Sequence, residues 1–368
     1  MDCLSDWPEP AVRVQSLSDS GTTILPPQYI KPSDQRPTEA NSHSDFNIPI
    51  VDLGVGTDAK VVAVAVSEAC KKWGFLQVVN HGVSLELLHR TRELWRGFFH
   101  LPMETKEAYA NSPKTYEGYG SRVGIEKGAL LDWGDYFFLH FFPQGLKSHE
   151  NWRALPASLR ETVDEYGREV TKLCVRIMGM LSLGLGLEEE RMKRAFGGEE
   201  AGVCMRVNYY PKCPQPELAL GLSSHSDPGG ITVLLPDDKV QGLQVKHRGV
   251  WVTVQPMANA FIINVGDQVQ VLSNATCCSV EHRVLVNSEA ERLSLATFYN
   301  PKSDLLLGPI KELVGPGQPT LYQPMTFDQY RQHVRKRGLH GKSQVESLKA
   351  VDHGPSSCNM IGPSITLG

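Results

Sequence analysis

Two histidines and one aspartate are spaced as ligands for a single metal ion. In His225-Ser226-Asp227, residues two apart on an extended backbone point to the same face, so an imidazole and a carboxylate converge. His282 lies in a segment of strand-like composition and can supply a second imidazole from a neighbouring strand. Such a set leaves open positions on an octahedral metal, as in non-haem Fe(II) enzymes that bind a cosubstrate and dioxygen. The three residues predict an iron centre rather than a closed zinc site.

An arginine and a serine on the next predicted strand strengthen this interpretation. A histidine and an aspartate two residues apart are common by chance and usually mark a polar turn. Arg292 and Ser294, however, follow His282 by ten and twelve residues and share one face of their strand. A guanidinium and a hydroxyl together can bind the distal carboxylate of a dicarboxylate. Arg292 alone would indicate only a salt bridge at a strand edge, but the order and spacing of the whole set favour a cosubstrate site.

Further arginines predict an anionic substrate. Arg206, Asn208 and Tyr210 alternate along one strand, so their side chains share a face. Arg331 and Arg335 are four residues apart on a predicted helix and can present two guanidinium groups to one ligand. The alternative is that arginines near a helix C-terminus interact only with the helix dipole and with solvent. The residues themselves leave both interpretations open.

The elements that must position these side chains are mainly strands. From Val203 onward, short β-branched and aromatic segments alternate with Pro and Gly, which is typical of a barrel or sandwich. Strands are expected at 203–210, 231–235, 243–254, 261–265, 279–286 and 292–299, after a first strand at 48–53 and a second at 75–79.

Helical periodicity and capping residues place helices on both sides of this region. Asp58 and Ser84 are expected to cap two helices, and a long apolar stripe predicts a third helix over 157–185. Thr326 and Gln329 form a capping-box pattern that opens a last helix ending at Gly338.

The organisation of the chain is expected to be one large domain. Residues 1–45 are predicted to be an extended, partly mobile arm and residues 46–200 a mainly helical region packed on the core. Residues 201–338 would form the catalytic core with its C-terminal helix, followed by a flexible tail over 339–368.

Composition and charge limit the class of partner. A formal net charge of -4 gives no basic field for nucleic acid or anionic lipid, so we expect neither nucleic acid nor membrane as a partner. The start of the chain lacks a signal-peptide pattern, and no stretch has the apolar length of a membrane span. We therefore expect a cytoplasmic protein that could also enter the nucleus. The eight scattered cysteines predict reduced thiols rather than a zinc site.

The motifs in their order resemble the plant 2-oxoglutarate-dependent dioxygenases. The resemblance covers most of the chain and includes WGFLQVVNHGV (73–83), NYYP (208–211), the His-x-Asp, His and Arg-x-Ser elements, and FYNP (298–301). It implies an α+β fold, a double-stranded β-helix of jelly-roll or cupin type with flanking α-helices. It also implies Fe(II) held by His225, Asp227 and His282, and 2-oxoglutarate bound by Arg292 and Ser294 with Tyr210 and Asn208. The family oxidises 2-oxoglutarate to succinate and carbon dioxide and usually hydroxylates its substrate, with ascorbate as the reductant.

Other segments resemble the jasmonate-induced oxygenases within this family. They include WPEP (7–10), YIKP (29–32), FDQYR (327–331) and GKS (341–343). Those enzymes hydroxylate jasmonic acid to 12-hydroxyjasmonate, which lowers jasmonate signalling and defence. By position, Arg206, Arg331 and Arg335 would bind the jasmonate carboxylate, and Phe138 and Phe298 would pack against its ring and chain. Residues 274–278 depart from the relatives, which more often have lysine or tyrosine near the cysteines.

Two alternatives remain on sequence grounds. A flavonoid-oxidising enzyme related to anthocyanidin or flavonol synthases would share the fold, but three convergent arginines suit a neutral polyphenol poorly. A catalytically silent jasmonate-binding protein would share the arginines, but it would not need a complete metal triad.

Overall fold

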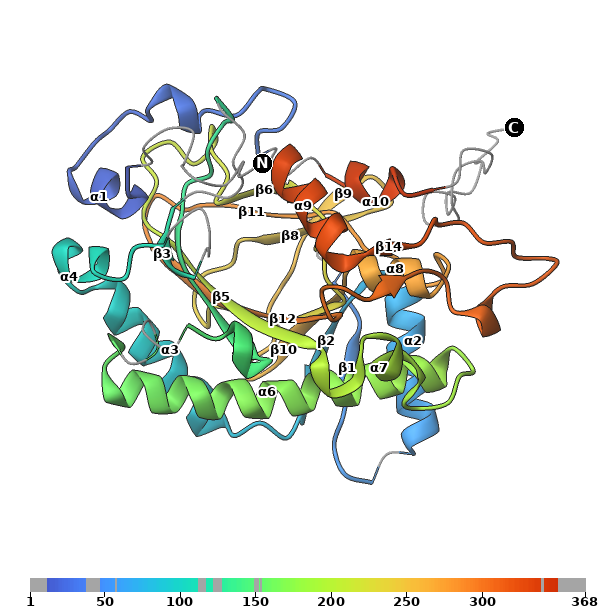
Figure 1. Cartoon of the computed structure of the whole chain (residues 1–368). Coiled ribbons are helices and arrows are strands. Elements are labelled where there is room, and N and C mark those ends of the chain that lie inside the picture. Colours follow the sequence, from blue (N-terminus) through green and yellow to red (C-terminus); the bar gives the residue numbers. More distant parts are fainter. Residues whose placement is uncertain are drawn as a thin grey trace.

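Two facing β-sheets form the centre of the molecule (Figure 1). The computed structural model describes residues 12–37, 47–56, 58–111, 117–121, 128–148, 152, 154–338 and 341–349. The larger sheet contains, in spatial order, β1 (Ile50–Asp52), β2 (Phe75–Val79), β10 (Phe261–Val265), β7 (Ile231–Leu235), β12 (Arg292–Asn300), β5 (Gly202–Tyr210), β4 (Asp135–Phe142) and β3 (Gly118–Gly120). The smaller sheet contains β6 (Leu222–His225), β11 (His282–Val284), β8 (Leu243–His247) and β9 (Val250–Thr253). A short pair, β13 (Leu306–Leu307) and β14 (Met325–Thr326), lies apart from them.

This arrangement confirms the predicted double-stranded β-helix. All pairings in the two main sheets are antiparallel except that of β1 with β2. Apolar side chains on the outer face of the larger sheet pack against helices, whereas its inner face turns toward the smaller sheet. The space between the sheets is therefore available for polar residues that a close-packed core would exclude.

Helices cover the outer face of the larger sheet, and the predicted ones are confirmed. They are α2 (Ala59–Lys72), α3 (Leu85–Phe99) and α6 (Ala157–Gly184), which runs below the sheet in Figure 1. Asp58 and Ser84 accept hydrogen bonds from the first-turn amides of α2 and α3, as expected for N-caps. The predicted stripe on α6 is buried, including Tyr166 and Val170. None of the described helices combines the length and apolar character that a membrane crossing requires.

The remaining described helices are shorter. They are α1 (Val14–Asp19), α4 (Met103–Glu107), α7 (Arg191–Ala195), α8 (Asp267–Leu272), α9 (Phe327–Arg337) and α10 (Ser343–Glu346), with single 3-10 turns at Pro27–Tyr29, Gln144–Leu146, Gly198–Glu200 and Lys311–Leu313. The capping box predicted at Thr326 is present, because its side chain and that of Gln329 bond each other's backbone amides.

The boundary expected at residue 201 does not divide the structure. Strands β1 to β4 come from the region predicted to be mainly helical, yet they belong to the same sheet as β5. Strand β4 pairs with β5 along most of its length. Its run of aromatic residues concealed the strand, because such a run can equally indicate a buried helix.

The N-terminal segment is not an extended arm over the described residues 12–37. Helix α1 begins there, and its first two amides, those of Val14 and Gln15, donate to the buried carboxylate of Asp135 at 2.9 and 3.0 Å. The same carboxylate accepts the hydroxyls of Ser121 and Tyr119. Sequence patterns missed this docking because the partner lies more than a hundred residues away.

Residues 341–349 of the predicted flexible tail are packed against the rest of the protein. Val345 of α10 is fully buried and belongs to a cluster with Tyr322 and Tyr330. The amide of Gly341 donates to the carbonyl oxygen of Ser224 on β6 at 2.9 Å. A short segment with few apolar residues gave no sequence sign of this packing. Residues 350–368 and 1–11 lie outside the described part.

We expect Asp135→Asn to destabilise the fold by about 2 kcal/mol. The amide group of asparagine would face donors that now point at a carboxylate oxygen, so at least one buried donor would lose its acceptor. Urea unfolding measures the change. Asp19→Asn, the same substitution at an exposed position of α1, should change the free energy of unfolding by less than about 0.5 kcal/mol. Equal effects of the two substitutions would contradict the docking role.

Candidate metal and cosubstrate site

The two predicted histidine ligands face each other across the smaller sheet. His225 ends β6 and His282 begins β11, and they are direct partners in the antiparallel register. Asp227 follows two residues after His225. Its Oδ1 lies 3.5 Å from Nε2 of His225 and 3.7 Å from Nε2 of His282. All three side chains are buried, and their ligand atoms lie within 4.8 Å of one another. The structure therefore brings the predicted triad to one point.

Backbone carbonyl groups orient both imidazole rings. Nδ1 of His225 lies 2.8 Å from the carbonyl oxygen of Ser223, and Nδ1 of His282 lies 3.1 Å from that of Val280. A carbonyl oxygen can only accept, so each Nδ1 carries the proton and each Nε2 presents its lone pair to the centre. Burial, together with the nearby His225, lowers the pKa of His282 to about 4. The ring is therefore neutral at physiological pH, as a metal ligand must be.

Two residues on adjacent strands hold the aspartate. Oδ2 of Asp227 accepts hydrogen bonds from Nδ2 of Asn264 at 2.8 Å and from the hydroxyl of Thr232. Asn264 on β10 and Thr232 on β7 are register partners. Burial alone would raise the pKa of Asp227, but His282, His225 and Asn264 outweigh it and lower the pKa well below its usual value. Oδ1 is thus left, ionised, to face the histidines.

Arg292 and Ser294 are buried on the inner face of β12. Nη1 of Arg292 donates to the Ser294 hydroxyl at 3.3 Å, and the guanidinium lies over the ring of Tyr210, its register partner. Its Nε has no hydrogen-bond partner among the described residues. A Cβ at Gly242 would lie 3.1 Å from Cδ of Arg292, so glycine leaves room for the arginine there. A buried guanidinium with an unused donor suits the distal carboxylate of a dicarboxylate.

Successive rows of side chains cross the inner face of strands β4, β5 and β12. Asn208 lies between Tyr136 and Ser294, and Arg206 lies between Phe138 and Ala296. In the next row, Cys204 lies between His140 and Phe298. The alternation predicted for β5 is therefore confirmed, and the register places Phe138 and Phe298 on the same face.

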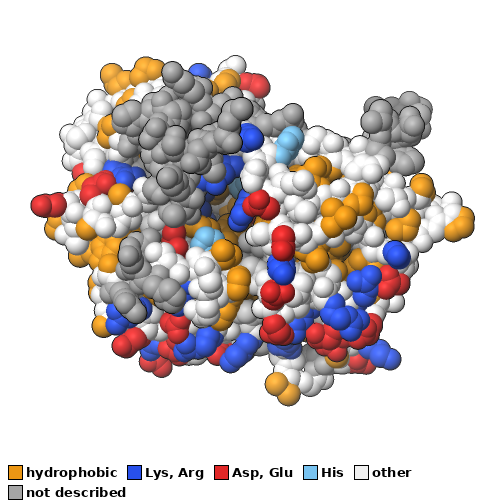
Figure 2. Space-filling view, in the orientation of Figure 1, with side chains coloured by type: hydrophobic (Ala, Val, Ile, Leu, Met, Phe, Trp, Pro, Cys, Tyr) orange, Lys and Arg blue, Asp and Glu red, His pale blue; other side chains and the backbone are white. Residues whose placement is uncertain are grey.

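One cavity of about 750 Å³ contains the whole predicted set. Its lining includes all twelve residues singled out from the sequence: Phe138, Arg206, Asn208, Tyr210, His225, Asp227, His282, Arg292, Ser294, Phe298, Arg331 and Arg335. Histidine and basic side chains gather around a hollow near the centre of the face shown in Figure 2. The roles of the individual residues in binding remain predictions.

Several lining residues were not predicted. Tyr136 and His140 come from β4, and Thr232 and Asn264 hold Asp227. The guanidinium of Arg206 lies 4.1 Å from the centre of the Tyr136 ring. Recognising β4 as a strand would have placed Tyr136, Phe138 and His140 on one face by simple alternation.

Helix α9 contributes the two remaining arginines. Arg331 and Arg335 both line the cavity, as the first of the two interpretations of their spacing requires. Nη2 of Arg331 also donates to Asp328 at 2.8 Å, and its side chain is 47% exposed. Arg331 therefore lies at the mouth of the cavity, where an incoming anion would compete with Asp328.

Family comparisons agree with this geometry. Residues 201–301 match the model of the 2OG-Fe(II) oxygenase superfamily, and residues 48–158 match that of the N-terminal region of the non-haem dioxygenases in morphine synthesis. The chain belongs to the 2OG-Fe(II) oxygenase superfamily. It is therefore an oxygenase enzyme whose cofactor is Fe(II) and whose cosubstrate is 2-oxoglutarate.

Individual relatives of this oxygenase cover nearly all of its length. Jasmonate-induced oxygenase 1 of Arabidopsis thaliana is 59% identical over 351 residues, 93% of this chain and 87% of the relative. Flavanone 3-dioxygenase 2 of Oryza sativa subsp. japonica is 40% identical over 339 residues, 91% and 97% of the two chains. The crystal structure of JOX2 in complex with 2OG, Fe and JA is 58% identical, covers 94% of this chain and 99% of that one, and superposes with a TM-score of 0.88.

The residues of this oxygenase fit both groups that its family binds. His225, Asp227 and His282 would hold iron through two nitrogens and one oxygen, and Arg292 with Ser294 would hold the far carboxylate of 2-oxoglutarate. When bound, iron and 2-oxoglutarate would together activate dioxygen, the oxidant that breaks the C–H bond. The protein orients these groups, neutralises the carboxylate and excludes water, because every one of these side chains is buried.

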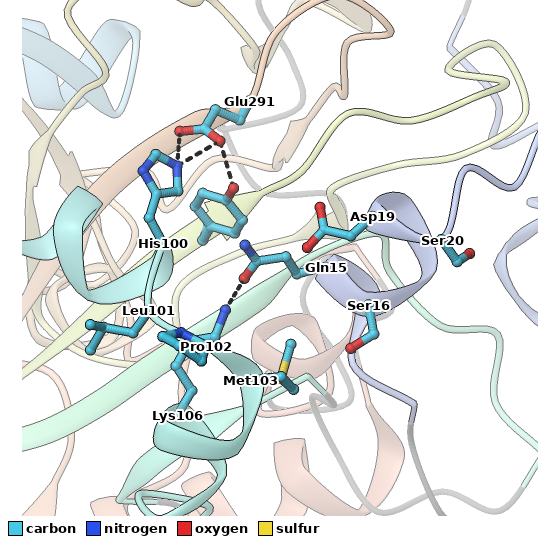
Figure 3. A pocket seen from close by; sticks show the side chains of 11 residues that line it. Gln15, Ser16, Asp19, Ser20, His100, Leu101, Pro102, Met103, Lys106 and Glu291 are labelled. Carbon is cyan, nitrogen blue, oxygen red and sulfur yellow. Dashed lines mark hydrogen bonds and ion pairs between the residues drawn. The ribbon is translucent and has the colours of Figure 1, made fainter.

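A polar network behind the larger sheet supports the two strands that carry the cosubstrate residues. It borders a second cavity of about 800 Å³ (Figure 3), which is lined by Tyr209, whereas the neighbouring Tyr210 lines the first cavity. The carboxylate of Glu291 accepts from the hydroxyl of Tyr209 at 2.6 Å and lies 2.9 Å from Nε2 of His100. Glu291 and Tyr209 immediately precede Arg292 and Tyr210 in the chain. The network therefore joins the two strand ends at the row that faces 2-oxoglutarate.

We expect Arg292→Lys to raise the KM for 2-oxoglutarate about 30-fold, which corresponds to about 2 kcal/mol. A lysine keeps the charge but loses the planar fork that can bind a carboxylate through two hydrogen bonds. Succinate formation at varied 2-oxoglutarate concentrations gives the KM. Arg92→Lys is the matched control, because Arg92 is also buried but bonds the carbonyl oxygen of Pro236 outside the cavity. An unchanged KM in Arg292→Lys would disprove the assignment.

Proposed function

We propose that this oxygenase hydroxylates jasmonic acid to 12-hydroxyjasmonate, using Fe(II), dioxygen and 2-oxoglutarate with ascorbate as reductant. The reaction would lower jasmonate signalling and defence in a plant. The observation that carries the proposal is a second cationic group in the cavity, formed by Arg206, Arg331 and Arg335 and separate from Arg292. Arg206 lies four residues from Tyr210 on β5, and Tyr210 pairs with Arg292. About 13 Å of strand therefore separates the two arginine rows.

The positive charge of the second cationic group favours a substrate that carries a carboxylate. Arg292 is assigned to 2-oxoglutarate, whereas Arg206, Arg331 and Arg335 border the rest of the cavity. The Nε of Arg206 is buried and has no hydrogen-bond partner among the described side chains. A substrate that carries a carboxylate would supply the missing acceptor and offset the burial of this charge.

Apolar groups beside the arginines suit the remainder of jasmonic acid. Phe138 neighbours Arg206 in the register, and Phe298 lies in the next row. Phe298 is the register partner of Thr232, whose hydroxyl holds the metal ligand Asp227. A ring and a short hydrocarbon chain bound against these phenyl groups would therefore lie close to the metal centre.

The similar proteins support the same choice. JOX2 was crystallised with 2OG, Fe and JA, and it resembles this chain over almost its whole length. The likeness to Flavanone 3-dioxygenase 2 is lower, and a neutral flavonoid would leave the second cationic group without a counter-charge. A silent binding protein would not need His225, Asp227 and His282 arranged as ligands. We also propose that the enzyme acts in the cytoplasm.

We expect the purified protein, with Fe(II), ascorbate and 2-oxoglutarate, to add one oxygen atom to jasmonic acid. Mass spectrometry detects the product, and succinate should form in equal amount. His225→Ala is the control without a complete metal site. Absence of the hydroxylated product together with turnover of a dihydroflavonol would identify a flavonoid enzyme instead. Jasmonic acid binding without succinate or hydroxylated product would indicate a silent binding protein.

We expect the double substitution Arg331→Ala and Arg335→Ala to raise the KM for jasmonic acid at least about tenfold. It should leave metal affinity in the absence of jasmonic acid unchanged, because neither arginine belongs to the metal triad. Steady-state rates and a metal titration provide the two measurements. Lys336→Ala removes an exposed charge from the same helix and should leave the KM unaltered. If the double variant behaves like Lys336→Ala, these arginines only solvate the surface.

A further inference from the structure

Helix α9 is joined to α8 through Tyr330, which lies next to the cavity-lining Arg331. Tyr330 immediately precedes Arg331, and its side chain is 1% exposed. Its hydroxyl donates to Oδ2 of Asp267 at 2.7 Å. Asp267 is equally buried and is the first residue of α8. The helix that borders the substrate cavity is therefore joined to α8 by a buried hydrogen bond to a carboxylate.

Asp267 in turn binds the segment that contains two metal ligands. Its Oδ2 also accepts the hydroxyl of Ser226 at 3.2 Å, and Ser226 lies between His225 and Asp227. The backbone amide of Asp267 donates to the carbonyl oxygen of Asp227 at 2.8 Å. One residue thus holds the His225–Asp227 loop from its side chain and from its backbone. A continuous chain of hydrogen bonds runs from α9 to the metal ligands.

The segment that follows α9 holds the same loop from another side. The amide of Gly341 donates to Ser224, and the carbonyl oxygen of Gly341 accepts the amide of Ser226 at 3.2 Å. These bonds add a bridge beside His225 at the edge of the smaller sheet. Figure 1 shows α9 next to β6 and β11. Gly341 therefore binds the backbone on both sides of His225, in addition to the link from Tyr330 through Asp267.

We propose that Tyr330 and Asp267 are positioning residues that couple α9 to the His225–Asp227 loop, so that substrate and metal bind cooperatively. This inference rests on the proposed function for its substrate. A substrate carboxylate bound by Arg331 and Arg335 holds α9 in place. The Tyr330 hydroxyl then holds Asp267, and through it the His225–Asp227 loop, in place. Such coupling is reciprocal, because a substrate that tightens metal binding must itself bind more tightly when the metal is present.

Tyr322 offers a matched control for Tyr330. It is also buried and belongs to the same apolar cluster. Its hydroxyl accepts a hydrogen bond from Gln270 of α8 at 2.7 Å, and Gln270 in turn accepts the amide of Ser279 rather than bonding the His225–Asp227 loop. Tyr322→Phe and Tyr330→Phe therefore remove the same atom from the same cluster, but only Tyr330→Phe breaks the chain of hydrogen bonds to the loop.

The test is an anaerobic titration of the metal-free full-length protein with Fe(II), with 2-oxoglutarate present, with and without jasmonic acid. We expect Tyr330→Phe to weaken metal binding about tenfold, because residues outside the ligand set typically change metal affinity by this order. Tyr322→Phe should leave it within about twofold. Jasmonic acid should tighten metal binding by about fivefold or more in the native protein, and this effect should be lost in Tyr330→Phe.

Two results would overturn the inference. One is a metal affinity that Tyr330→Phe leaves at the native value or that Tyr322→Phe lowers equally. The other is a jasmonic acid effect that survives Tyr330→Phe, since direct contact between substrate and metal site would not need the tyrosine. If jasmonic acid does not bind the native protein at all, the proposed function fails, while the metal titration still decides whether Tyr330 positions the loop.

Discussion

The antiparallel pairing of β6 with β11 is the constraint on which the site depends. It places His225 and His282 directly opposite each other, with ring centres 4.2 Å apart. A shift of one residue would turn one imidazole to the other face of the sheet, so the ligand set exists only in this register. Backbone carbonyls on the same segments fix both ring orientations. The metal site is thus a property of strand pairing as much as of residue type.

The register of the larger sheet likewise positions the residues that would bind the cosubstrate and the substrate beside the metal. Its inner face presents Arg292 and Ser294 on β12, Tyr210 to Arg206 on β5 and Phe138 on β4, in rows set by the register. Two separate positive regions result within one cavity. A protein that bound only 2-oxoglutarate would need one of them, and the second therefore defines the kind of substrate more than the overall fold does.

Much of the fold and of the site could be predicted from the sequence, because it depends on residues that are close together in the chain. Alternation placed Arg206, Asn208 and Tyr210 on one face, and the capping pattern at Thr326 located α9 within a residue. The features that escaped prediction depend on contacts between distant parts of the chain. Asp135 docks α1, Asn264 holds Asp227 and Gly341 binds β6, and in each case the two partners lie far apart in the sequence. Periodicity carries no information about such pairs.

The buried position of Arg292 also affects the release of succinate after turnover. Succinate keeps the distal carboxylate of 2-oxoglutarate and loses only the end nearest the metal, so the guanidinium and Ser294 cannot distinguish product from cosubstrate. Discrimination would have to come from the metal end, where 2-oxoglutarate would offer a keto oxygen that succinate lacks. Arg292 thereby binds 2-oxoglutarate and also slows the release of succinate. The two molecules compete for this one arginine.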